Sequence, residues 1–100
     1  FAASDYAALG ALRRLRERGL RVPDDVSLVG FDDIPLASLL QPPLTTVAQP
    51  IGELGREGVR LLVETIQTGQ TTRPPVQRFP VRLVERESVK TFGETERKTT

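Results

Sequence analysis

The stretch from Ser27 to Pro50, SLVGFDDIPLASLLQPPLTTVAQP, decides the fold class. It begins as an apolar run, continues into two adjacent acids and ends in a segment bracketed by prolines. A nearly continuous apolar run from Val26 to Phe31 is typical of a parallel strand covered on both faces. The next apolar residues, Ile34 to Leu40, predict a short helix with Asp33 as its N-cap and Pro35 in its first turn.

Two longer helical patterns flank this stretch. The first starts at Ser4-Asp5, whose side chains suit a helix N-terminus, and runs to about Arg18 before Gly19. The second runs from Ile51 to about Thr68, with Gly69 at its end. Leu44 to Val47 is a short extended crossing segment, and residues 76–88 alternate well enough for a strand. Strands and helices in this order predict an α/β domain with covered parallel strands.

Asp32 and Asp33 follow the predicted strand directly. Adjacent side chains of an extended strand point to opposite faces, so the two carboxylates are not expected to converge on one substrate. Asp33 is therefore assigned to the helix cap. Asp32 lies beyond the carboxyl end of a strand, where open α/β sheets bind ligands. The residues alone leave Asp32 open between a ligand contact and a turn. For Ser4-Asp5 a helix cap is favoured, unless these residues share a cleft with Asp32.

The composition restricts the chemistry. The 100 residues include no Cys and no His, which removes disulfides, thiolate and imidazole metal sites and every Ser-His triad. Net charge is +1, from 14 Lys and Arg against 13 Asp and Glu, and gives no reason to expect nucleic-acid or membrane binding. The arginines from Arg13 to Arg21 are predicted to form a solvated helix face, because Arg13 and Glu17 are spaced as an i,i+4 pair. We expect no metal, no cofactor and no membrane partner.

Several motifs in combination resemble the LacI/GalR family of bacterial transcription regulators. They are VPDDVSLVGFDD, PPLTTVAQP and ELGR, supported by FAASDYAALGALRRLRERGL and, more weakly, by FPVRLVERES. The resemblance extends to about Ser88. It implies a cytoplasmic, non-enzymatic regulator with an N-terminal helix-turn-helix, a hinge and a two-lobed sensor. This chain resembles the C-terminal part of that sensor, a partial, parallel-sheet, periplasmic-binding-protein-like type I fold. The absence of Met and the opening FAASD also indicate a fragment of a longer protein.

The resemblance also implies roles for individual residues. Asp32 matches the pocket acid that accepts hydrogen bonds from ligand hydroxyls, and the implied effector is sugar-like. Ser4, with Asp5 beside it, falls where many sugar-sensing members carry Asn. Gln49 matches a position lining the cleft, and Ile51 falls where some members place an aromatic. The chain would form a homodimer through a set of apolar positions, Leu9, Leu12, Leu36, Leu39 and Leu40. Operator DNA would be bound only through the N-terminal module.

The resemblance divides residues 1–88 between two lobes. Residues 1–46 and 76–88 would belong mainly to the C-terminal lobe, and residues 47–75 would hold the crossover and the helix of the other lobe. Residues 89–100 are predicted to be a disordered tail. Such a piece should expose apolar surface, met by dimerisation, domain exchange or proteolytic trimming. Two other classes stay open: a sugar-binding receptor of a transporter, and a carboxylate- and Mg²⁺-dependent enzyme domain.

Overall fold

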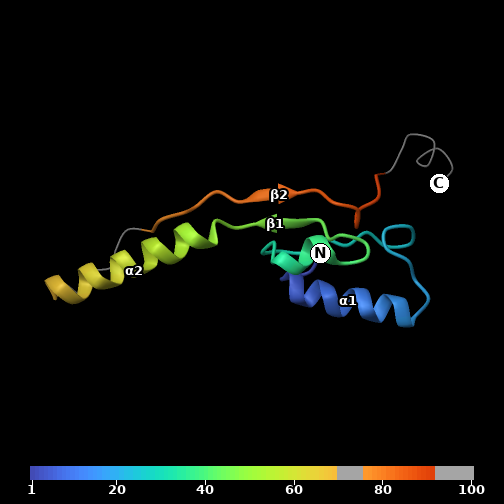
Figure 1. Cartoon of the computed structure of the whole chain (residues 1–100), viewed down its shortest axis with the longest axis horizontal. Helices are drawn as coiled ribbons and strands as arrows, with labels where there is room; N and C mark the ends of the chain where they lie inside the picture. The colour runs from blue at the N-terminus through green and yellow to red at the C-terminus, as the bar shows by residue number, and fades with distance from the viewer. Residues whose placement is uncertain (70–75, 92–100) are drawn as a thin grey trace. The chain divides into compact units, whose positions relative to one another are not determined.

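The computed structural model describes residues 1–69 and 76–91. It contains five elements (Figure 1): helix α1 (Asp5–Glu17), the 3-10 helix η1 (Pro35–Leu39), strand β1 (Thr46–Ala48), helix α2 (Ile51–Thr68) and strand β2 (Arg82–Val84). The chain divides into two compact units. The first comprises Phe1–Ala48 and the residues from Arg82 onward, and the second comprises Gln49–Val81. Residues 76–81, which the sequence assigned mainly to the lobe of residues 1–46, therefore belong to the second unit.

Helix α1 begins and ends as its sequence predicts. Ser4 is extended, with φ −154° and ψ 165°, and its Oγ accepts a 3.0 Å hydrogen bond from the amide of Ala7. After the last turn, Gly19 adopts φ +73°, and the amide of Leu20 donates to the carbonyl of Leu15 at 2.9 Å. A left-handed glycine followed by this hydrogen bond over five residues is the usual way to satisfy the last carbonyls of a helix.

The predicted parallel strand Val26–Phe31 is extended but does not form a regular ladder. Val29 makes an isolated parallel bridge with Thr45, and Asp32, directly after the segment, makes another with Ala48. The amide of Gly30 donates to the carbonyl of Thr45 at 3.0 Å, while on the other side the amide of Ala2 donates to the carbonyl of Val29 at 2.8 Å. The segment therefore lies between the first residues of the chain and the crossing segment, which positions the acids that follow it.

The only regular sheet in the described ranges is antiparallel. Strand β1 pairs with β2 in the register Thr46 to Val84, Val47 to Leu83 and Ala48 to Arg82. The alternating pattern of residues 76–88 thus forms a strand of three residues only. The side chain of Ser88, just beyond it, is buried, accepts from the amide of Thr45 at 2.8 Å and donates to the carbonyl of Leu28 at 2.6 Å. One hydroxyl therefore ties the end of the described chain to two extended segments.

The core of the first unit lies where α1, η1 and the extended segments meet. It consists of small and aliphatic side chains: Ala8, Leu12, Leu28, Ala37 and Leu44. The amide of Leu44 also donates to the carbonyl of Ala37 at 2.9 Å, so that η1 is held against the crossing segment. The small size of the two alanines, both fully buried, permits this close approach.

Helix α2 has the predicted bounds and ends at Gly69, which is left-handed with φ +66°. None of its residues is buried within the described chain. Its large apolar side chains are exposed: Ile51, Leu54, Val59, Leu62, Val63 and Ile66. The prediction of exposed apolar surface is therefore confirmed, whereas the means by which it is covered stays a prediction.

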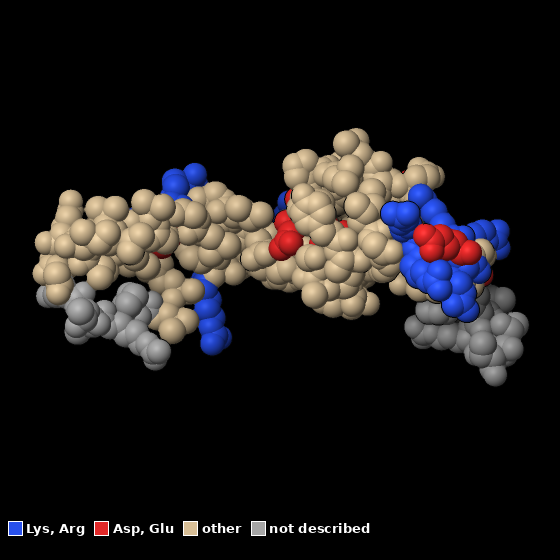
Figure 2. Space-filling model, turned by 90° about the horizontal axis from the view of Figure 1, so that it is seen from below, with Lys and Arg blue, Asp and Glu red and all other residues tan. Residues whose placement is uncertain are grey.

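Charged side chains gather beside the C-terminal half of α1. Figure 2 shows basic side chains grouped at one end of the first unit with acidic side chains between them. On α1, the Glu17 carboxylate lies 3.4 Å from Arg13 and 3.1 Å from Arg14. The predicted i,i+4 pair is thus present and exposed, as expected for a solvated face. No helix in the described ranges is long and apolar enough to cross a bilayer.

Of the predicted tail, residues 89–91 are described, and the amide of Lys90 donates to Ser27 Oγ at 2.9 Å. Residues 92–100 lie outside the described residues, as do residues 70–75 of the loop after α2.

Candidate functional site

The acids after the Val26–Phe31 segment form a sharp backbone turn. Asp32 and Asp33 have φ of +121° and +59°, values that residues other than glycine seldom adopt. Each such residue costs on the order of 1–3 kcal/mol and persists only where neighbouring structure enforces it. The argument that an extended strand sends the two carboxylates to opposite faces is therefore wrong in its premise, because the chain is not extended at Asp32 or Asp33.

Asp33 does not cap the following helix, so that prediction is wrong. The N-cap of η1 is Ile34, which makes no side-chain capping bond. Instead, Asp33 Oδ1 accepts a 2.8 Å hydrogen bond from Arg86 Nη2, and both side chains are largely buried. A carboxylate facing a guanidinium gains more from that partner than from a backbone amide of a short 3-10 turn.

Asp5, not Asp33, accepts a hydrogen bond from the backbone at the start of η1. The amide of Ile34 donates to Asp5 Oδ2 at 2.8 Å, and Thr46 Oγ1 donates to Asp5 Oδ1 at 2.6 Å. Asp5 is fully buried, and its own amide donates to the carbonyl of Phe31 at 2.9 Å. Both carboxylate oxygens are thus engaged inside the protein. We therefore propose a structural role for Asp5 in place of the predicted ligand contact.

The other predicted ligand contacts fall in different parts of the chain. Ser4 is part-exposed and serves as the N-cap of α1, while Asp32 is part-exposed and its amide donates to the carbonyl of Val47 at 2.8 Å. These two belong to the first unit. Gln49 and Ile51 belong to the second unit, where the amide of Ile51 donates to the carbonyl of Gln49 at 2.9 Å.

The apolar positions predicted to form a dimer interface differ in burial. Leu12 is only 4% exposed and is part of the core, so it offers almost no surface to a partner. Leu39 is 77% exposed and Leu36 is 39% exposed, both on η1, while Leu9 and Leu40 are half-buried. We therefore propose core packing for Leu12 in place of the predicted interface contact.

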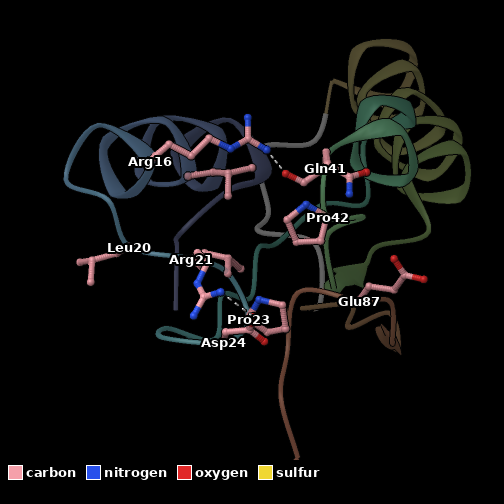
Figure 3. A pocket seen from close by; sticks show the side chains of 10 residues that line it. Arg16, Leu20, Arg21, Pro23, Asp24, Gln41, Pro42 and Glu87 are labelled. Atoms are coloured by element: carbon pink, nitrogen blue, oxygen red, sulfur yellow. Dashed lines mark hydrogen bonds and ion pairs between the residues drawn. The ribbon is translucent and has the colours of Figure 1, made fainter.

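A separate open hollow of about 380 Å³ lies between α1, the loop after it and the Gln41-Pro42 segment (Figure 3). Two of its basic side chains have partners: Arg16 Nη2 donates to the carbonyl of Gln41, and Arg21 Nη1 lies 3.8 Å from Asp24 Oδ2. None of the predicted ligand contacts lines it. It is thus distinct from the Asp32 turn.

The donors and acceptors around the acids can form hydrogen bonds with a polar ligand. Across residues 1–69 and 76–91 there is no group of three or more acids placed to hold a metal ion. A part-exposed carboxylate on a fixed turn can accept two hydrogen bonds from neighbouring hydroxyls. The structural partners Arg86 and Thr46 were missed by sequence reasoning, since both act across more than 40 residues and no local pattern indicates such pairs.

Comparison with known proteins identifies the larger context. Residues 1–89 match the family model of the periplasmic binding protein-like domain. The HTH-type transcriptional regulator CelR of Thermobifida fusca is 51% identical over 88 residues, which is 88% of this chain and 26% of that protein. A solved complex of the transcriptional regulator CelR with cellobiose superposes with a TM-score of 0.78 and 51% identity, covering 88% of this chain and 27% of that one.

Two other solved structures extend the likeness. A LacI family transcriptional regulator from Enterococcus faecium, with bound ribose, has a TM-score of 0.80 and 39% identity, covering 93% of this chain and 34% of that one. The lac repressor dimer bound to operator and the anti-inducer ONPF has a TM-score of 0.75 and 41% identity, covering 90% of this chain and 32% of that one. The chain thus spans about a quarter of the curated relatives it matches. The resemblance to LacI-type regulators and the periplasmic-binding-protein-like fold are both confirmed.

Proposed function

Because the chain belongs to the family of periplasmic binding protein-like domains, we propose that it is the ligand-sensing and dimerisation portion of a LacI-type transcriptional regulator. The observation that carries this proposal is the family match over residues 1–89, joined to 51% identity with CelR, a regulator solved with a sugar. The matched relatives are transcriptional regulators, not enzymes.

The proposed effector is a sugar or a related metabolite. Asp32 would accept hydrogen bonds from ligand hydroxyls, with Ser4 of the same unit in support. Gln49 and Ile51 of the second unit are proposed as further ligand contacts. Asp32 is part-exposed, and its turn is held by the hydrogen bond from the Asp32 amide to the carbonyl of Val47. This supports the assignment, because a ligand can reach a fixed acceptor. A carboxylate is also well suited to neighbouring hydroxyls, each of which donates one proton.

The proposed mechanism couples effector binding to DNA affinity. A sugar that binds one lobe arrangement more tightly shifts the population of the full-length dimer toward that arrangement. Dimerisation would use the exposed leucines of η1, Leu36 and Leu39, with Leu9 and Leu40 around them. Operator DNA would be contacted through an N-terminal module, in the cytoplasm.

The proposal is tested on the full-length protein. Its operator is first selected from random-sequence duplexes, and operator affinity is then measured by fluorescence anisotropy with and without cellobiose, followed by ribose. We expect one of these sugars to change operator affinity by about 5- to 150-fold. Sugar binding by calorimetry without any selected DNA would contradict the proposal and favour a transporter receptor.

A further inference from the structure

The Asp32 turn requires external support. Two successive residues, Asp32 and Asp33, carry positive φ, and neither is a glycine. The backbone on either side is held by hydrogen bonds: the amide of Asp32 donates to the carbonyl of Val47, and the amide of Ile34 donates to Asp5 Oδ2. These bonds fix the ends of the turn but leave Asp33, the residue between them, to be held through its side chain.

Arg86 supplies that contact and is itself firmly anchored. Its Nη2 lies 2.8 Å from Asp33 Oδ1, its Nη1 donates to the carbonyl of Leu44 at 2.9 Å, and its amide donates to Thr45 Oγ1 at 2.8 Å. The guanidinium therefore bridges the turn and the crossing segment. A planar fork with fixed donors can make both side-chain bonds at once, which a lysine ammonium cannot do in the same geometry.

This ion pair differs from the others in the described part of the chain. The Arg86 and Asp33 side chains are only 19% and 22% exposed, and the pair spans 53 residues of sequence. In every other ion pair recorded there, at least one side chain is more than half exposed and the partners are three or four residues apart. Exposed local pairs contribute little to stability, whereas a largely buried long-range pair fixes the geometry of what it joins.

We infer that the Arg86–Asp33 pair sets the orientation of Asp32 toward the effector, which makes Arg86 a positioning residue for ligand binding. This inference rests on the proposed function of Asp32 as the effector's hydrogen-bond acceptor. Arg86 itself need not touch the ligand. Its effect passes through Asp33 to the neighbouring Asp32, because rotation of the backbone at one residue of so tight a turn reorients the next.

The first experiment needs no ligand. Hydrogen exchange is measured on the full-length protein for wild type, Arg86→Met and Arg86→Lys, with Arg13→Met as the control, since Arg13 forms an exposed local ion pair with Glu17. We expect Arg86→Met to speed exchange of the Asp32 amide by about tenfold more than that of the Ala8 amide, which belongs to a fully buried core residue and donates to the carbonyl of Ser4. Equal acceleration of the two amides would show that Arg86 only stabilises the fold, which overturns the inference.

The second experiment is a double-mutant cycle on cellobiose affinity, measured by calorimetry. Arg86→Met should weaken binding by about tenfold, Arg86→Lys should weaken it less, and Arg13→Met should leave it unchanged. In the Asp32→Ala background, Arg86→Met should cost almost nothing more, because the residue through which it acts is gone. An equal loss in both backgrounds would contradict the inference.

The outcomes separate this inference from the proposed function. If Asp32→Ala weakens cellobiose binding while Arg86→Met leaves it unchanged, the positioning role is wrong and the function stands. If Asp32→Ala binds as wild type does, the assignment of Asp32 is wrong. If the full-length protein does not bind cellobiose, the inference is tested by the hydrogen exchange of the Asp32 amide measured without ligand.

Discussion

Thr46 Oγ1 donates a 2.6 Å hydrogen bond to Asp5 Oδ1, and neither residue has any exposed surface. The other oxygen of Asp5 accepts from the amide of Ile34 at 2.8 Å. One buried carboxylate thus joins the first turn of α1, the start of η1 and strand β1. The backbone on either side of the Asp32-Asp33 turn, at Phe31 and Ile34, is held by Asp5, so the ligand-binding proposal depends on these contacts.

Replacing Thr46 with Val removes the hydroxyl but keeps the shape. The buried Asp5 carboxylate then lacks a donor, and we expect the free energy of unfolding to fall by about 1.5–3 kcal/mol. Thr46→Ser, which keeps the hydroxyl and loses a methyl group, should cost about 1 kcal/mol. Urea unfolding of the full-length protein measures both. A larger loss for Ser than for Val would show that the methyl group, not the hydrogen bond, matters.

Position 30 must be glycine, because a larger residue would collide with the same Asp5 carboxylate. A Cβ on Gly30 would lie 2.2 Å from Asp5 Oδ1, closer than real contacts allow, and 3.0 Å from Leu44 Cδ2, tighter than most real contacts. We expect Gly30→Ala to destabilise the protein by about 1–3 kcal/mol, as overpacked cores do. Gly10→Ala is the control, because a Cβ on Gly10 meets nothing within 4 Å. The midpoint temperature of thermal unfolding should be much lower in Gly30→Ala than in Gly10→Ala. Equal midpoints for the two variants would contradict the described packing.

Leu39 tests the dimer proposal. A charge at this exposed position should weaken self-association, because an apolar contact would have to bury an unpaired carboxylate. We expect Leu39→Asp to raise the dimer dissociation constant by at least about tenfold in analytical ultracentrifugation. Val89→Asp, at an apolar position that is 40% exposed and lies outside the predicted interface, should leave dimerisation unchanged. A fully dimeric Leu39→Asp protein would exclude η1 from the interface.

Helix α2 offers a pH-dependent test. The side-chain hydrogen bond from Arg60 lowers the pKa of Glu57 below its ordinary value of 4.5. Because the pKa of Glu57 is lowered in the folded state, the contribution of the pair to the free energy of unfolding is present above pH 4.5. It is lost as pH falls through the folded-state pKa. Carboxyl NMR titration should find the lowered pKa. Arg60→Gln should return the pKa toward 4.5, while Arg56→Gln should not, and a Glu57 pKa insensitive to Arg60 would be inconsistent with the pair.

Local patterns predicted the helices well. The cap at Ser4, the left-handed Gly19 and Gly69, and the bounds of α2 all depend on residues close in sequence. The sheet was predicted less well. Val26–Phe31 forms an isolated bridge in place of the predicted regular parallel strand, and β2 is far shorter than the alternation of residues 76–88 indicates.

The candidate site depended on contacts that no local pattern encodes. Asp33 has the sequence position of a cap, yet Arg86 lies within reach only after the chain folds, and the buried pair is preferred. Asp5 was judged a cap or a ligand contact, because nothing nearby in sequence indicates that Thr46 and Ile34 both donate to it. The position of Asp32 beyond an extended segment was predicted, whereas its positive φ was not.

The central claim is that Asp32 binds the effector of a DNA-binding regulator. The most direct measurement compares wild type with Asp32→Ala in the full-length protein, using calorimetry with cellobiose or ribose, whichever binds, and anisotropy with the selected operator. We predict that sugar affinity falls by about 10- to 100-fold while operator affinity without sugar is unchanged, because one charge-assisted hydrogen-bonding group is lost from the pocket alone. Unchanged sugar affinity in Asp32→Ala would contradict the account.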